Sequence, residues 1–500
     1  MSKTPLFLII VLFLLNLSGF TQNKDGSVHL SDSLYYPYIQ IVRVEIEGNK
    51  LTKPQIITRE LDFKTGDSLA AFNTAKSVAP SSRIFTPKDS SELMLKLKYS
   101  RDNIINTKLF LIVNLYLKQE QGNQYKLMID VTERNYFWIF PIIKLNAPNI
   151  NEWLRDPKWS DISMGLFSSY NNLWGLSHQS SIIFYFGKSW GGAFGYYIPW
   201  IGHGQKVGLK VGVSYKNNYM VEYGSNYNKR QMIYSANSSQ EAKFGVSLNL
   251  RPGLYNYGTI KLSGEFITVS DSVFKMDSNY LAGNKKNNGS LSLYADYYYD
   301  SRNSKSYPLM GTMLKGFVNK IGLGIGSKEV DLFYYGIDFH FYQKISKKFY
   351  VAEMVKAENS SGEKYPYYYQ LNLSSKNDFI RGYDLYTFKG DQMYYFRSNF
   401  KYELIKPNIK KAKPGEEKSK FKNLQYAFYL NAFADAGYVR NKFNDQYYIT
   451  NDYLTNKMLL SWGLGIDFVT YYDLVLRFEY AWTGRPNWSN GFFIAFGMPI

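Results

Sequence analysis

The chain has 500 residues and a formal net charge of +18, and its 46 tyrosines and 34 phenylalanines give most of an 18% aromatic content. A mean hydropathy of -0.32 excludes a bundle of membrane-spanning helices, and the absence of cysteine excludes disulfides, thiolate metal sites and cysteine nucleophiles. The basic residues are scattered without a nucleic-acid-binding motif, so they indicate anionic lipid headgroups or acidic glycans rather than nucleic acid. A transmembrane β-barrel reconciles abundant aromatics with low hydropathy, because its strands alternate between lipid and lumen. A large secreted β-sandwich is the alternative.

The N-terminus has the pattern of a signal peptide, with Lys3 ahead of an apolar run from Leu6 to Leu17 and small residues after it. We predict cleavage near Thr21, which makes residues 1–21 a signal peptide and 22–37 a polar linker. No later apolar run reaches the roughly 18 residues of a membrane helix, so a position in the membrane would require a closed barrel.

Residues 38–134 have the composition of a small α/β domain. Alternating residues, a proline near a helix start and glycine-asparagine turns mark its elements. The β-α-α-β-β order, with the segments Val44–Asn49 and Asn106–Phe110, resembles a POTRA domain, the periplasmic module of outer-membrane assembly proteins. The stretch from Ala70 to Lys88 is longer than the usual connection between the two helices. The predicted elements are a strand over Ile39–Ile46, a helix from Thr52 to Leu61, a helix over Ser91–Asn106 and strands over Leu111–Lys118 and Tyr125–Glu133.

From residue 136 to residue 500 the pattern is strand after strand, and we predict a sixteen-stranded antiparallel transmembrane β-barrel. An even number of strands returns the chain to the side where it entered, as in bacterial single-chain barrels. The predicted strands lie near 137–147, 161–171, 178–187, 191–199, 206–216, 241–250, 257–269, 289–300, 311–320, 331–342, 348–357, 393–404, 425–437, 458–469, 472–482 and 491–500.

Loop lengths agree with this count, because long extracellular loops should alternate with short periplasmic turns. One periplasmic turn is long, Lys406 to Lys420, where six lysines face two glutamates. We interpret it as a solvated loop, with contact to a periplasmic partner or to anionic headgroups as the alternative. The predicted long loops are 217–240, 270–288, 358–392 and 438–457, and the predicted short turns are 200–205, 251–256, 343–347 and 470–471.

The candidate site lies in the loop before the twelfth predicted strand. Strand alternation turns Asp435 and Glu403 toward the lumen, and a loop that folds inward could pair Arg381 with either carboxylate through charge-assisted hydrogen bonds. Gly382 would allow a turn closed to other residues, and Tyr383 could stack on the barrel wall. The alternative is a surface loop whose arginine meets solvent.

The sequence Ile380-Arg381-Gly382-Tyr383, followed by Phe433-x-Asp435-x-Gly437, resembles the paired signature of the BamA/TamA-type superfamily, in which POTRA domains precede a sixteen-stranded barrel. This resemblance implies that Asp435 holds the Arg381 loop in the lumen as a latch. Asn172–Gly175, Asp300–Arg302, Pro308 and Gly311 agree with the same superfamily.

The resemblance also implies a function, since members insert barrels into the outer membrane of Gram-negative bacteria or move polypeptides or lipids across it. A client strand would add at a seam between Phe137–Ala147 and Gly491–Ile500, where Pro499 cannot donate a ladder hydrogen bond. The implied partners are outer-membrane lipids, unfolded or translocating polypeptides, and periplasmic or lipoprotein partners of the POTRA. A single POTRA indicates a specialised member.

We therefore predict an outer-membrane protein that acts in insertion or translocation of proteins, without cofactor or metal. The alternative is a channel or surface receptor that passes solutes or binds ligands through its long loops. An enzyme is not expected, because no G-x-S-x-G, H-E-x-x-H or phosphate-binding glycine loop occurs. The four histidines are too scattered for a metal site: His29, His178, His203 and His340.

Overall fold

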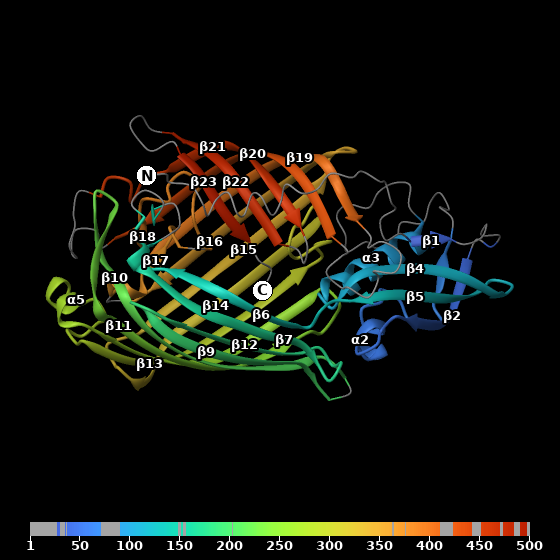
Figure 1. The fold of residues 1–500 in the computed structure, drawn as a ribbon, viewed down its shortest axis with the longest axis horizontal. Helices are drawn as coiled ribbons and strands as arrows, with labels where there is room; N and C mark the ends of the chain where they lie inside the picture. The colour runs from blue at the N-terminus through green and yellow to red at the C-terminus, as the bar shows by residue number, and fades with distance from the viewer. Residues whose placement is uncertain are drawn as a thin grey trace.

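The computed structural model contains a small α/β domain followed by a large curled sheet (Figure 1). The predicted signal peptide, most of the linker and Pro499 lie outside the residues that it describes. Those residues are 28–30, 36, 38–71, 91–148, 152–153, 157–202, 204–362, 365–375, 377–410, 424–442, 452–470, 474–484 and 491–497.

The N-terminal domain is a five-stranded sheet in the order β1-β4-β5-β2-β3, with two helices. No helix of the described residues is long and apolar enough to cross a membrane. The elements are β1 (Val28–Leu30), β2 (Tyr38–Glu47), α2 (Pro54–Thr58), β3 (Ser68–Ala70), α3 (Glu92–Asn106), β4 (Phe110–Gln121) and β5 (Gln124–Glu133).

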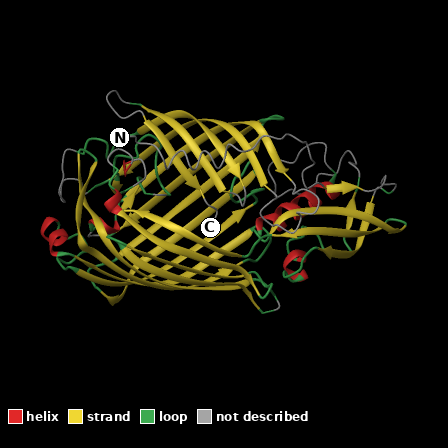
Figure 2. Ribbon diagram, in the orientation of Figure 1, coloured by secondary structure: helices red, strands yellow, loops and turns green. Residues whose placement is uncertain are grey.

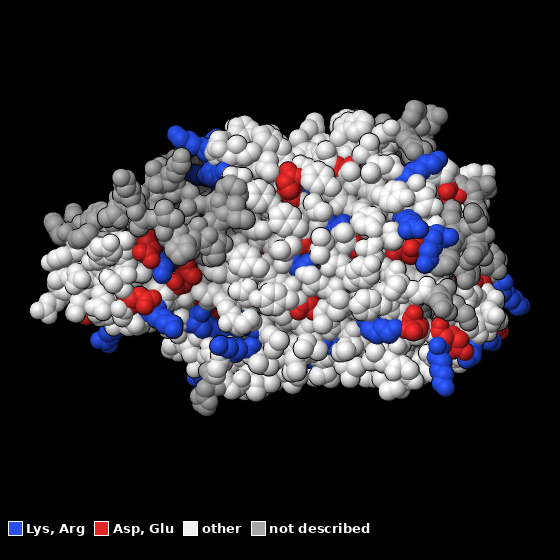
Figure 3. All heavy atoms as spheres, turned by 180° about the vertical axis from the view of Figure 1, so that it is seen from behind, with Lys and Arg blue, Asp and Glu red and all other residues white. Residues whose placement is uncertain are grey.

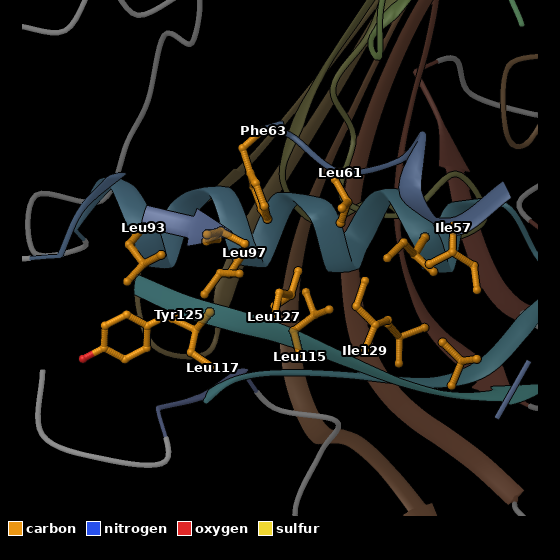
Figure 4. Close-up of a cluster of buried hydrophobic side chains, with 14 of the residues drawn as sticks. Ile57, Leu61, Phe63, Leu93, Leu97, Leu115, Leu117, Tyr125, Leu127 and Ile129 are labelled. Carbon is orange, nitrogen blue, oxygen red and sulfur yellow. The ribbon is translucent and has the colours of Figure 1, made fainter. Parts of the chain in front are cut away.

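Local chemistry explains both helices of this domain. Pro54 occupies the first turn of α2, where its missing N–H costs no helical hydrogen bond. The Ser91 hydroxyl caps α3 by accepting from the Met94 amide at 3.3 Å. Leu93 and Leu97 on α3 pack against Leu115 and Leu127 of the sheet, and all four are buried (Figure 4). This packed layer is the core of the domain.

Two strands of this sheet were not expected from the sequence. The segment predicted as a linker contains β1, which pairs in parallel with β4, and β3 pairs with the start of β2. Each is only three residues long. A segment of that length carries no alternation, so sequence periodicity could not reveal it.

The predicted sixteen-stranded antiparallel barrel is confirmed. All neighbouring strands pair antiparallel, and the sheet order follows the chain from β6 to β23. Figure 2 shows that helices are confined to the N-terminal domain and the opposite end of the barrel. The barrel strands are β6 (Phe137–Leu145), β7 (Ile162–Leu173), β8 (His178–Phe186), β9 (Trp190–Ile201), β10 (Val207–Asn226), β11 (Lys229–Leu250), β12 (Asn256–Val269), β13 (Asn287–Asp300), β14 (Gly311–Gly326), β15 (Leu332–Lys344), β16 (Phe349–Ser361), β19 (Gln392–Lys410), β20 (Leu424–Arg440), β21 (Leu459–Thr470), β22 (Leu474–Thr483) and β23 (Gly491–Gly497).

The two faces of the barrel differ as a membrane protein requires. On β21, Leu460 and Leu464 are 48% and 58% exposed on the outside, whereas Ser461 and Asp467 are buried on the inside. On the face seen in Figure 3, uncharged atoms cover most of the middle of the barrel exterior, with scattered charged side chains among them. This alternation follows from the two-residue period of a strand, which places successive side chains on opposite faces.

Two predicted loops are partly strand. β10 and β11 continue to Asn226 and from Lys229, so most of the loop predicted at 217–240 is an extended hairpin. The polar side chains there broke the apolar alternation that marked the strands, but the backbone pairing continues beyond the apolar band. For the same reason β19 runs to Lys410, into the predicted turn at 406–420, of which residues 411–423 lie outside the described part.

The N-terminal domain docks on the turns at one end of the barrel, called the domain end below; the opposite end is called the far end. The buried Glu60 carboxylate accepts two hydrogen bonds from Arg251, each of 2.6 Å, in the β11–β12 turn. Burial alone would lower the pKa of Arg251, but the bonds to Glu60 raise it. In the β7–β8 turn, the Gly175 carbonyl accepts from the Lys53 amide at 3.0 Å. A side chain at Gly175 would collide with the Leu51 carbonyl, so the close approach requires glycine.

Candidate functional site in the barrel lumen

A long loop between β16 and β19, residues 362–391, is called the lumenal loop here. It contains the short strands β17 (Leu371–Asn372) and β18 (Lys389–Gly390), which pair with each other. Ile380, Tyr383 and Phe388 are 1–2% exposed, within a cluster that includes wall residues of β15, β19, β20 and β21. The loop is therefore packed inside the far end of the barrel rather than held in solvent.

Arg381 forms a fork with Asp435 on β20. Its Nε donates to Asp435 Oδ2 at 2.8 Å and its Nη2 donates to Oδ1 at 2.5 Å, while its backbone amide also donates to Oδ2 at 3.2 Å. The ring of Phe433 lies 3.8 Å from the guanidinium carbon. Arg381 and Asp435 are 7% and 3% exposed, so the pair is largely removed from solvent.

The remaining guanidinium nitrogen has two acceptors that the sequence did not predict. Arg381 Nη1 donates to Asn399 Oδ1 on β19 at 2.7 Å and to Glu479 Oε1 on β22 at 3.1 Å. One arginine thus joins three barrel strands. The sequence did carry a sign of Glu479. It occupies a lumen-facing position two residues after Arg477, in a strand that is otherwise mostly apolar.

Glu403, predicted as a second partner of Arg381, does not contact it within the described residues. It accepts a hydrogen bond from the Tyr350 hydroxyl at 3.1 Å instead. Glu403 pairs with Tyr429, six residues before Asp435 on β20, so it lies roughly 20 Å along the strand from the Arg381 fork. The alternation of side chains along the strand correctly predicted that Glu403 faces the lumen. It could not predict how far along the barrel axis Glu403 lies from Arg381.

Three further signature residues shape the contact between loop and wall. Gly382 has a φ of +88°, and a Cβ there would lie 3.0 Å from a Thr483 methyl. The Tyr383 hydroxyl donates to the Leu460 carbonyl at 3.0 Å. A Cβ on Gly437 would approach Ile380 Cγ1 to 2.6 Å, so the wall is glycine where the loop's isoleucine packs.

A second arginine secures the other flank of the loop. Arg397 on β19 donates from Nε to the Phe379 carbonyl at 2.9 Å and lies over the Phe379 ring. The next loop carboxylate, Asp378, pairs with Lys356 of β16 at 2.9 Å and accepts from the Tyr395 hydroxyl at 3.1 Å. Each charge here has an opposite charge or a carbonyl within reach.

The long β10–β11 hairpin holds the loop from the opposite side. Glu222 on β10 accepts from the loop residues Tyr367 and Thr387 at 2.5 and 3.0 Å. Arg230 on β11 donates to the Asp384 carbonyl at 3.1 Å. At the hairpin tip, the Thr387 amide donates to the Asn228 carbonyl at 2.8 Å. The lumenal loop is consequently tied to walls on both sides of the barrel.

This site is suited to holding a segment of the chain in place. Each buried ion would cost several kcal/mol without a partner, so an unpaired Arg381 or Asp435 is strongly disfavoured. The described residues contain no group of three or more potential metal ligands. Withdrawal of the loop would require the Arg381 fork and its Glu479 and Asn399 bonds to break together.

The barrel matches a known family and solved structures. The Omp85 superfamily domain matches residues 172–497, well over half of the chain. No curated protein matches this chain. Among solved structures, BamA from Haemophilus ducreyi lacking POTRA domains 1-3 is similar at a TM-score of 0.50 and 12% identity, covering 91% of this chain and 84% of that one.

CdiB from Escherichia coli is similar at a TM-score of 0.49 and 10% identity, covering 94% of this chain and 91% of that one. At such identities the BamA structure supports the fold alone. The family follows from the match to the superfamily domain, which contains both Arg381 and Asp435. The chain therefore belongs to the Omp85 superfamily.

Proposed function

We propose that this protein inserts polypeptides into the outer membrane of a Gram-negative bacterium or translocates them across it. The observation that carries the proposal is that the described part of the chain shows no pairing between the first and last barrel strands. Within the described residues, β6 and β23 form the two ends of the sheet and no pairing joins them. Strand edges left open in this way can accept an incoming strand through main-chain hydrogen bonds.

The N-terminal domain would contribute to this function by acting as a periplasmic POTRA domain. Its elements β2, α2, α3, β4 and β5 follow the β-α-α-β-β order, and its two helices lie on one face of the sheet. Residues 134–136 alone separate it from β6, the strand at one side of the seam. A client or partner bound by this domain would lie close to the open strand edge.

The Arg381 fork would act as a latch that keeps the lumenal loop inside the barrel. Its acceptors lie on β19, β20 and β22, and β22 pairs directly with the seam strand β23. The loop therefore stiffens the wall next to the seam. Because the wall beside the seam is held by the loop, the barrel would open at the β6–β23 junction rather than elsewhere.

The alternative function, an open channel or surface receptor, is less well supported. A channel requires a clear lumen, whereas here the buried cluster around Tyr383 and Phe388 joins the lumenal loop to the barrel wall. The many buried loop tyrosines contribute to packing rather than forming an exposed binding surface, since Tyr365 and Tyr369 are 1% and 6% exposed.

Depletion in the native host followed by quantitative proteomics of purified outer membranes tests the function. We expect a defined set of barrel or surface proteins to decrease before growth is affected, because their insertion or export requires this protein. Complementation with the wild-type chain should restore them. An unchanged outer-membrane proteome would reject assembly and translocation in favour of a channel or receptor.

A further inference from the structure

A second segment enters the lumen, from the domain end. The β13–β14 turn, residues 301–310, carries Tyr307, which is 6% exposed although it belongs to a turn. Its hydroxyl donates to Asp467 Oδ2 on β21 at 2.6 Å. In the sheet order β21 is five strands from β14 and six from β13. This hydrogen bond therefore crosses the interior of the barrel.

The opposite wall receives Tyr307 in a prepared position. The ring of Tyr429 on β20 lies 4.9 Å from the Tyr307 ring, and the Lys401 ammonium on β19 lies 3.9 Å from that ring's centre. Lys401 is also 3.7 Å from Asp467. Tyr429 and Asp467 are register partners, and Tyr429 lies six residues from Asp435 on the same strand. The wall formed by β19 to β21 thus holds Arg381 toward the far end and Tyr307 toward the domain end.

Hydrogen bonds within the turn hold it together. The Asn303 side chain accepts from the amides of Leu309 and Met310, both at 3.0 Å, which closes the turn on itself. Arg302 forms a fork with Asp300, both bonds being 2.8 Å. Gly311 has a φ of +104°, and a Cβ there would meet the Ser301 carbonyl at 2.3 Å. A force on the base of the turn would therefore move Tyr307 with it.

The N-terminal domain grips the base of this turn. Asn106, the last residue of α3, donates to the carbonyls of Arg302 and Asn303 at 3.3 Å each. The side-chain oxygen of Asn106, Oδ1, accepts from the Lys305 amide at 3.1 Å. Because Glu60 also anchors the domain to Arg251, Asn106 has a fixed position on the barrel.

We propose that the β13–β14 turn is a plug of the domain end of the lumen, and that docking of the N-terminal domain through Asn106 keeps Tyr307 inserted. Displacement of the domain, for example by a bound polypeptide, then withdraws Tyr307 from Asp467 and gives access to the lumen from that side. This device depends only on the contacts around the turn and not on the identity of a client.

Thiol labelling tests the plug, because the natural chain has no cysteine. Asn431→Cys places one thiol at a buried wall position between Asp435 and Tyr429. The labelling rate by a charged, membrane-impermeant maleimide is measured in nanodiscs.

We expect Tyr307→Ala to raise this rate severalfold and Tyr307→Phe to raise it less, since the ring remains. Asn106→Ala should raise it as well, and the Asn106→Ala/Tyr307→Ala double variant should label no faster than Tyr307→Ala.

Tyr294→Ala is the matched control, because the Tyr294 hydroxyl also donates to an aspartate, Asp296 at 2.8 Å, but both residues belong to the wall strand β13. Folding of each variant is checked by heat-modifiable migration; if Tyr307→Ala does not fold, Tyr307→Phe and Asn106→Ala decide. An unchanged rate in the folded Tyr307 variants would overturn the plug. An unchanged rate in Asn106→Ala alone would overturn the coupling to the domain.

Discussion

Arg381 shows how a common tripeptide acquires a specific role from its surroundings. All three of its guanidinium nitrogens donate hydrogen bonds. Nε and Nη2 bind Asp435, and Nη1 binds Asn399 and Glu479. A lysine offers one nitrogen and cannot reproduce the planar fork that a carboxylate accepts. The position therefore requires arginine, and its partners must lie on different strands of one wall.

Removing either member of the fork should have the same effect. Arg381→Ala and Asp435→Ala should each weaken docking of the lumenal loop by about 3–5 kcal/mol. The first leaves the buried Asp435 without the fork, and the second leaves the buried Arg381 with only Glu479 and Asn399. The double variant should be little worse than either single one. Loop docking is measured by limited proteolysis at the far end, and activity by complementation of a depletion strain.

The control for this cycle is Arg477→Ala, which removes an inward arginine of β22 that is 42% exposed and 3.9 Å from its nearest carboxylate. It should leave loop docking unchanged. If the effects of the Arg381 and Asp435 variants add independently, the two residues do not act as a pair.

Among the elements, the extended β10–β11 hairpin has a clear task, because its tip joins two loops at the far end. Asn228 is fully buried; its amide side chain donates to Thr455 at 3.0 Å and accepts from the Leu454 amide at 2.8 Å. Its φ of +57° is one that asparagine tolerates better than most residues. The hairpin tip therefore locks the lumenal loop against the β20–β21 loop.

Asn228→Ala should loosen this end of the barrel without unfolding it. We expect the packing of the hairpin tip to lose about 1–3 kcal/mol of stability, since the buried Leu454 amide and Thr455 hydroxyl lose their partner. Hydrogen exchange of the Thr387 and Leu454 amides should become faster. Asn226→Ala, at an exposed position two residues earlier, is the control, and equal exchange in the two variants would show that the tip is not a lock.

At the scale of the whole molecule, the seam decides between a static barrel and one that opens. If β6 and β23 separate during function, an introduced cysteine pair that cross-links them should abolish complementation under oxidising conditions, and reduction should restore it. A cysteine pair at the register partners Ala295 and Val318, which join β13 to β14, should have no effect. Full activity of the cross-linked seam would exclude lateral opening.

The sequence by itself determined the number of barrel strands and their inward and outward faces, and it placed Asp435 and Glu403 toward the lumen as candidate partners of Arg381. These features depend on the two-residue period and on charges at inward positions, which are local properties of the chain. The extended β10–β11 hairpin and the short strand β1 escaped because polar or very short strands carry no such period.

Only the tertiary structure decided which inward charges meet. Glu403 and Glu479 have the same parity, but curvature of the sheet brings β22 to the Arg381 guanidinium and leaves Glu403 beside Tyr350. The hydrogen bond from Tyr307 to Asp467 likewise joins residues 160 positions apart. Such contacts arise because the sheet curls round on itself, and the heights and angular positions of its strands are set by all the strand pairings together.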